Sequence, residues 1–280
     1  MKLLQLLARR GALLGLAVVL FIALVYLFFP ADRVDTLIGR QLAEQGLKLA
    51  PTARKTLLPG LSWRGATLSS DAGVLLRGDR LTVRPLLLPL LTGKVVLRTA
   101  LTLGNGWLQA DSGLNGREAL SLQADGIKLA DMPFFKTVLG ASAGGALWCE
   151  GRVRRDKGRM SGEIKLEVRQ LEFSGVTVGG MPLPNAANLR SQGMIRITDG
   201  KVRLESFTLQ GDGVYMRLSG DLPDGANAAA QPLNLVLEIM PKPEFMEQQK
   251  LVFLLLAKFT ATPGVYRIPI KGTLLKPSII

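Results

Sequence analysis

The segment Glu163-Ile164-Lys165-Leu166-Glu167-Val168-Arg169 decides the fold class, because charged and aliphatic residues alternate along it. A period of two places Ile164, Leu166 and Val168 on one face of a β-strand and the charged side chains on the other. A strand with one dry face and one wet face is typical of antiparallel sheet rather than of buried parallel sheet. We therefore expect a mainly β protein.

The same alternation recurs on both sides of this segment. Further strands are expected at residues 81–84, 94–103, 120–124, 147–154, 195–198, 202–209, 213–222, 233–239 and 265–274. Turn sequences separate them at short intervals, namely Ser112-Gly113, Asn115-Gly116, Asp125-Gly126, Asp156-Lys157-Gly158, Asp199-Gly200, Gly211-Asp212-Gly213 and Asp224-Gly225. Ten or more strands joined in this way predict one long antiparallel sheet, whose apolar face is covered by curling, by helices or by a ligand.

The N-terminal part of the chain has a different pattern. Residues 11–29 form an uncharged run of nineteen residues, which as a helix is about 28 Å long and so matches the hydrocarbon core of a bilayer. Lys2, Arg9 and Arg10 precede the run, which predicts a cytoplasmic N-terminus. A cleaved signal peptide is the alternative, but the run is longer than a signal core and lacks paired small residues at its end. We expect a cytoplasmic segment at 1–10, a single transmembrane helix at 11–29 and a periplasmic β-rich domain at 30–280.

A few short helices complete the expected fold. Residues 32–44 have helical spacing, with Val34, Leu37, Ile38 and Leu42 on one side. Two further helices are expected at 133–139 and 243–259. The second contains an apolar stretch at 251–257, for which we expect a lid packed on the sheet; membrane contact and partner docking are the alternatives.

Composition excludes most catalytic chemistry. The chain has no histidine and one cysteine, so it cannot form a Ser-His-Asp relay, a His-ligated metal site or an internal disulfide. Cys149 lies on the dry face of its expected strand and is interpreted as a buried small hydrophobe. Asp125 and Asp131 have no recognisable partners for acid–base work. We therefore expect no enzyme, no catalytic residues, no cofactor and no metal.

The charge balance is basic, with 35 Lys and Arg against 22 Asp and Glu and a net charge of +13. These residues are spread along the sequence rather than clustered in it. Attraction to anionic lipid headgroups or to an acidic protein partner is one interpretation, and a merely basic exported protein is the other. No nucleic-acid partner is expected, because aromatic residues are sparse and the domain is expected outside the cytoplasm.

Three parts of the chain resemble a known family. The first is Leu81-Thr82-Val83-Arg84-Pro85 with Leu90-Leu91-Thr92-Gly93 and Gly104-Asn105-Gly106, which resembles the pattern of strand, apolar turn, Leu-x-Gly, strand and Gly-rich turn of AsmA-like periplasmic proteins. The second is the strand–turn–strand region at 145–184, which ends in Met181-Pro182-Leu183-Pro184, and the third is the C-terminal segment at 268–279. With the N-terminal anchor and the chain length, the whole is similar to the protein N family of type II secretion systems (GspN).

This resemblance implies a bitopic inner-membrane protein of a Gram-negative bacterium with a curved, β-rich periplasmic domain. It implies a non-enzymatic secretion subunit whose partners are the inner-membrane platform and the outer-membrane secretin, and it supplies no catalytic residues. The wider AsmA-like group implies an alternative, a periplasmic lipid-binding or lipid-transfer protein with a β-groove that holds phospholipid acyl chains.

Overall fold

The structure is a computed structural model that describes residues 31–56, 59–224 and 228–279, together with Leu20, Leu24 and Tyr26. Apart from these last three residues, the expected transmembrane segment at 11–29 lies outside the described residues, as does the expected cytoplasmic segment at 1–10. Within the described ranges, no helix has the length and apolarity needed to cross a bilayer.

Most of the described chain forms one large antiparallel sheet. It has 16 strands, and its main path runs in the order β1-β3-β4-β5-β6-β7-β8-β9-β12-β13-β14-β15-β17-β16, while β2 pairs with β3 and β18 with β17. The strands are β1 (Leu47–Ala50), β2 (Arg54–Lys55), β3 (Leu61–Ser70), β4 (Gly73–Pro85), β5 (Val96–Leu103), β6 (Gly106–Gly113), β7 (Glu118–Lys128), β8 (Ser142–Asp156), β9 (Arg159–Ser174), β12 (Ala186–Thr198), β13 (Lys201–Gln210), β14 (Val214–Leu222), β15 (Asn234–Pro241), β16 (Thr260–Thr262), β17 (Val265–Thr273) and β18 (Lys276–Ile279). A separate hairpin consists of β10 (Thr177–Val178) and β11 (Met181–Pro182).

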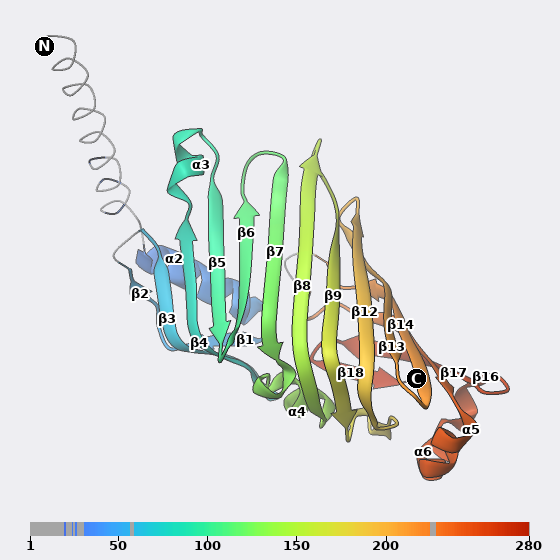
Figure 1. The fold of residues 1–280 in the computed structure, drawn as a ribbon. Coiled ribbons are helices and arrows are strands. Elements are labelled where there is room, and N and C mark those ends of the chain that lie inside the picture. The colour runs from blue at the N-terminus through green and yellow to red at the C-terminus, as the bar shows by residue number, and fades with distance from the viewer. Residues whose placement is uncertain are drawn as a thin grey trace, which may run out of the picture.

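The sheet curls, so that it has a concave and a convex face. Figure 1 shows C-terminal strands, drawn in orange to red, passing behind β9 and β12 in this view. The helices are short: α2 (Ala31–Glu44), α3 (Leu87–Leu91), α4 (Phe134–Leu139), α5 (Pro243–Gln248) and α6 (Lys250–Leu256), with single turns of 3-10 helix at η1 (Leu129–Asp131) and η2 (Ala257–Phe259). The expected mainly β fold with one long antiparallel sheet and a few short helices is confirmed.

The largest core fills the concave side of the C-terminal strands. Aliphatic residues of β9, β12–β15 and β17 pack there with Phe253 and Leu256 of α6 and with Val178 of the β10–β11 hairpin. The hairpin also approaches β18, since an added Cβ on Gly179 would lie 3.1 Å from the Cα of Ser278. Side chains from the β9–β12 connection and from the C-terminal strand therefore share one core. This shared core stabilises the curl at the C-terminal end of the sheet.

Helix α2 covers the other end of the concave side. Val34 and Ile38 pack on a cluster that contains Leu61 and Trp63 of β3, and Trp63 is 1% exposed. The helix ends at Glu44, and Gly46 then adopts a φ of 72°. This reversal, which only glycine adopts at low cost, turns the chain into β1.

Several details differ from the sequence-based expectations. Asp125-Gly126 is not a turn: it lies inside β7, where the pairing with β8 shifts register, because a glycine at positive φ serves a β-bulge as well as a turn.

The helix expected at 243–259 is broken at Gln249 (φ −127°, ψ 37°) into α5 and α6. As a lid it is confirmed in part, since α6 buries Phe253 and Leu256 but leaves Leu251, Leu254 and Leu255 exposed. Strands β1, β2, β3, β6, β16 and β18 and the β10–β11 hairpin were not expected, and Gly225 of the expected turn at 224–225 lies outside the described residues.

Candidate functional site: the concave face of the sheet

The strand register produces continuous rows of apolar residues across the concave face. The first row, which we call row one, crosses every strand of the main path from β3 to β17. Its members are Trp63, Leu81, Leu101, Leu108, Ala124, Cys149, Leu166, Gly193, Phe207, Leu218, Leu237 and Ile268. Strands lie about 4.8 Å apart, so row one extends about 50 Å along the curl.

Two parallel rows lie next to it. Row two consists of Leu61, Val83, Thr99, Ala110, Leu122, Gly151, Ile164, Ile195, Leu204, Gly220, Leu235 and Ile270. Row three consists of Pro85, Leu97, Ser112, Leu120, Val153, Gly162, Ile197, Val202 and Leu222. None of the three rows contains a charged residue, and together they form what we call the apolar face.

The apolar face is buried at its ends and at Ala124 and Cys149 of row one, but several other residues of its middle strands are half-buried. In row one, Trp63 and Ile268 are buried, whereas Leu166 and Phe207 between them are half-buried. In the middle of row two, Leu122, Ile164 and Ile195 are likewise half-buried. The middle strands therefore present aliphatic side chains that are not fully enclosed by the rest of the described chain.

Two glycines in this central part leave room for side chains of the neighbouring strands. An added Cβ on Gly151 would lie 2.6 Å from Cγ1 of Ile164, and one on Gly193 would lie 2.6 Å from Phe207 and 2.7 Å from Leu166. The side chains of the neighbouring strands therefore lie across both glycines. An alanine at Gly193 would force Phe207 or Leu166 to move, because core atoms tolerate no contact of that length.

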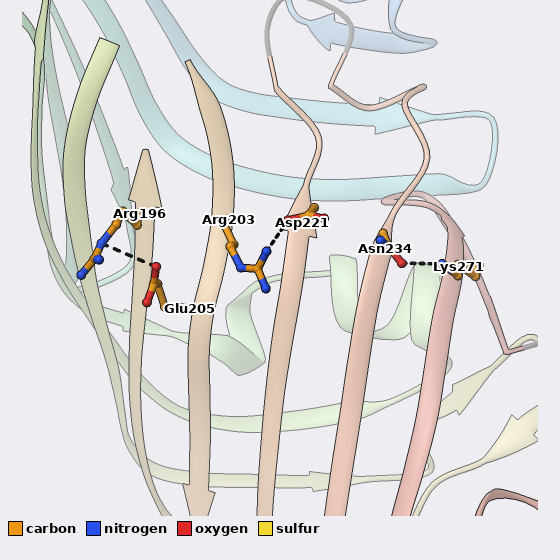
Figure 2. Close-up of polar contacts among 6 residues, drawn as sticks. All are labelled: Arg196, Arg203, Glu205, Asp221, Asn234 and Lys271. Atoms are coloured by element: carbon orange, nitrogen blue, oxygen red, sulfur yellow. Dashed lines mark hydrogen bonds and ion pairs between the residues drawn. The ribbon is translucent and has the colours of Figure 1, made fainter. Parts of the chain in front are cut away.

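Opposite charges face each other on the convex side of the central strands. Arg152 lies opposite Glu163 and Glu150 opposite Lys165 in the β8–β9 register. Figure 2 shows the same arrangement at one end of β12–β17, where Arg196 pairs with Glu205 at 3.6 Å and Arg203 with Asp221 at 3.2 Å, and Lys271 contacts Asn234. A cavity of about 670 Å³ beside these contacts is lined by three basic and four acidic residues. Because acidic and basic residues both line this cavity, it does not favour a ligand of either charge. Exposed ion pairs of this kind also contribute little to the stability of the fold.

One ion pair on the convex face of β5 and β6 is stronger. The guanidinium of Arg98 donates two hydrogen bonds of 2.7 Å to the two carboxylate oxygens of Asp111, and both side chains are largely withdrawn from solvent. Hydrogen bonding to Asp111 raises the pKa of Arg98, against the opposing effect of its desolvation. Bidentate geometry of this type is the strong form of an arginine–carboxylate contact.

Replacing Asp111 with alanine is expected to lower the free energy of unfolding by about 1–3 kcal/mol, because a partly buried arginine loses its charged partner. Glu247→Ala is the matched control: its contact with Lys250 is 3.9 Å long and exposed, and its loss should change the free energy by less than about 0.5 kcal/mol. Urea titration followed by circular dichroism measures both. Equal effects of the two substitutions would contradict the special role of the Arg98–Asp111 pair.

Cys149 lies in row one and is 9% exposed, as expected from its strand pattern. Burial raises the pKa of its thiol, so the folded protein holds less of the reactive thiolate at any given pH. Reaction with a soluble disulfide reagent at pH 8 should be at least tenfold slower in the folded chain than in guanidinium chloride. Equal rates would show that the central strands open readily.

The two carboxylates considered for catalysis do not form a site. Asp125 belongs to β7 and lies opposite Trp107 on the convex face, while Asp131 belongs to η1. In the described part of the chain, no group of three or more His, Cys, Asp or Glu residues is placed to hold a metal ion. The apolar face itself was only partly foreseeable: alternation marks the dry side of each strand, but not the register that aligns the strands into rows.

No family model matches the chain, and neither a curated protein nor a solved structure matches it.

Proposed function

We propose that the protein is a non-enzymatic subunit of a type II secretion system, anchored in the bacterial inner membrane by residues 11–29 with its sheet in the periplasm. The observation that carries this proposal is the architecture of the described chain beyond α2, which consists mostly of one large curled antiparallel sheet with few helices. This is the domain type that the sequence resemblance implies. The inner-membrane platform and the outer-membrane secretin are the proposed partners.

The N-terminal edge of the sheet offers a docking element. β1 stands at the end of the strand order and pairs with β3 on one side only. An edge strand can receive a strand of another chain through main-chain hydrogen bonds. Its Lys48 is exposed and lies on the convex side, opposite Ser69.

A photo-crosslinking amino acid at position 48, introduced into the full chain in actively secreting cells, tests this docking. Crosslinks to the inner-membrane subunits of the secretion machine are expected. Position 160 is the control, because Met160 is exposed in the β8–β9 hairpin at a distance from the edge. Identical crosslinking patterns at both positions would contradict docking at β1.

A second candidate function is lipid binding on the concave side. The specific observation that favours it is the uncharged apolar face, in which Leu166, Ile164 and Ile195 of the middle strands are half-buried. Burial of a sixteen-carbon acyl chain, at about 0.8 kcal/mol per CH₂, gives of order 10 kcal/mol of gross stabilisation. Such binding needs no catalytic group, and a secretion subunit could use it as well.

A further inference from the structure

Arginines face arginines at two places on the convex side of the first strands. In the β3–β4 register Arg64 lies opposite Arg80, and in the β4–β5 register Arg84 lies opposite Arg98. Like charges directly opposite each other destabilise a sheet. Arg196 and Arg203 also face each other in β12 and β13, but each of them has a carboxylate of its own (Figure 2). Among the four arginines of the first strands, the described ion pairs give a carboxylate to Arg98 alone.

The sequence spreads these basic residues over about fifty positions, but the fold gathers them. Neighbouring residues of one strand face opposite sides of the sheet, and paired residues of two strands face the same side. Each of these basic residues either neighbours a concave-side residue in its strand or pairs with a convex-side residue of the next strand, so its side chain lies on the convex side. We call the set the basic patch: Lys48, Arg54, Arg64, Arg77, Arg80, Arg84 and Arg98. The sole carboxylate in strands β1–β5 is Asp79, which accepts a hydrogen bond from the backbone of Gly104. Within the described residues, Arg98 is the one member of the patch with an ion pair.

Exposed leucines lie beside the patch, at the end of β4 and β5 where α3 is placed (Figure 1). Leu88 and Leu91 of α3 are 79% and 58% exposed, and Leu114 of the β6–β7 turn is 59% exposed. Hydrogen bonds hold the turn to the segment after α3: Leu114 donates to the carbonyl of Val95 at 2.9 Å, and the Asn115 side chain donates to the carbonyl of Gly93 at 2.8 Å. We call these three leucines the leucine corner.

The combination identifies the kind of partner. Arginines and lysines bind anionic lipid headgroups, while leucines beside them enter the boundary between headgroups and acyl chains. An acidic protein segment would account for the basic patch but not for three exposed leucines with Arg84 and Lys94 around them. The position in the chain agrees, because β1 follows the apolar segment at 11–29 after one helix of about 20 Å.

We propose that the basic patch and the leucine corner together dock on the surface of an anionic phospholipid bilayer, which holds the N-terminal end of the sheet against the membrane. The inference rests on the membrane anchoring in the proposed function. It adds the surface of the sheet that contacts the bilayer and the charge of the lipid it selects.

An environment-sensitive fluorophore on Leu88→Cys, in a Cys149→Ala background of the full chain, tests the docking. The chain is reconstituted into vesicles of phosphatidylcholine alone or with phosphatidylglycerol, and quenching by nitroxide-labelled lipid is measured. We expect the label to be quenched in the anionic vesicles and exposed to water in the neutral ones. The same label at Leu251 of α6 is the positional control, since that exposed leucine has no basic patch beside it.

Charge variants make the test specific. Arg64→Gln, Arg80→Gln and Arg84→Gln together should lower the ratio of embedded to water-exposed label by on the order of 100-fold, from the usual contribution of a basic side chain near an anionic surface. The triple variant Arg196→Gln, Arg203→Gln and Arg217→Gln removes the same charge from the convex face of β12–β14 and should leave the ratio unchanged. The inference is overturned if the label stays exposed to water in anionic vesicles. It is also overturned if quenching is equal in both kinds of vesicle and is unchanged by the substitutions in the basic patch.

Alkaline carbonate extraction separates this inference from the proposed function. A chain that is released at alkaline pH contradicts the anchor at 11–29 and hence the proposed function. A chain that stays in the membrane while the label at position 88 remains exposed contradicts the docking alone. The same labelled chain is also mixed with an acidic polypeptide in the absence of vesicles. If the polypeptide shields the label at position 88 from water and anionic vesicles do not, the partner is a protein and the inference is overturned.

Discussion

Replacing Trp63 with alanine is expected to lower the free energy of unfolding by about 3–5 kcal/mol, the usual cost of removing a fully buried tryptophan. Trp63 is 1% exposed and lies between the sheet and α2, where it shares a cluster with Val34, Ile38 and Leu61. Its side chain is also the first member of row one. Its loss leaves a cavity under α2, so the helix should detach before the rest of the sheet unfolds.

Trp107→Ala is the matched control. Trp107 lies on the convex face of β6 and is 41% exposed, so its removal should change the free energy by well under 2 kcal/mol. Urea titration measures the total effect, and hydrogen exchange of the α2 amides measures the local one. A loss at Trp63 no larger than that at Trp107 would contradict the packing of α2 on the concave side.

The second large effect is expected at the centre of the apolar face. The double substitution Leu166→Gln and Ile195→Gln should weaken binding of a fatty acid by about 100-fold or more, because each aliphatic side chain contributes about 1.5–3 kcal/mol when a ligand buries it. Both residues are half-buried and belong to neighbouring strands, in row one and row two. The substituted amides stay uncharged and partly exposed, so the fold should persist.

Met194→Gln is the control for this pair. Met194 is next to Ile195 in β12 but lies on the convex side, opposite Lys165 and Ser206. Binding of a fluorescent fatty acid to the purified chain, with circular dichroism as the test of folding, gives the comparison. A double variant that folds and binds like the wild-type chain, or a Met194 variant that binds as poorly, would rule out the concave side as the lipid site.

The strands that could be predicted from the sequence are those with uninterrupted alternation. The segment at 163–169 lies inside β9, and the segment at 213–222 forms β14 from residue 214 on; each faces the concave side with the aliphatic residues expected. The β8–β9 and β12–β13 turns at Asp156-Lys157-Gly158 and Asp199-Gly200 are also confirmed, with Lys157 and Asp199 at positive φ. Local chemistry determines these features, so they can be read from neighbouring residues.

The two long strands that were missed, β3 and β6, break the alternation. In β3 the buried residues are Leu61, Trp63 and Ala66, because Gly65 adopts a φ of 62° and shifts the faces by one position. In β6 small residues such as Ala110 and Ser112 occupy the concave side, so no hydrophobic pattern is visible in the sequence. A propensity argument that depends on regular apolar spacing misses both cases.

The apolar rows and the basic patch depend on register between distant segments. Arg64 and Arg80 lie sixteen positions apart in the sequence, and only the β3–β4 pairing brings them opposite each other. Bulges in β7, β9 and β12 also change the alignment along the sheet. Charges that are scattered in the sequence therefore form a cluster in the fold, which the sequence alone could not reveal.

The most direct test of the central claim is a clean deletion of the gene in its source bacterium, followed by assay of secreted enzymes in the medium, the periplasm and the cells. Our account predicts that the enzymes accumulate in the periplasm behind an intact outer membrane, and that the full-length gene restores their release. Normal secretion together with detergent sensitivity or altered outer-membrane lipid would contradict the secretion role and would favour lipid handling on the apolar face.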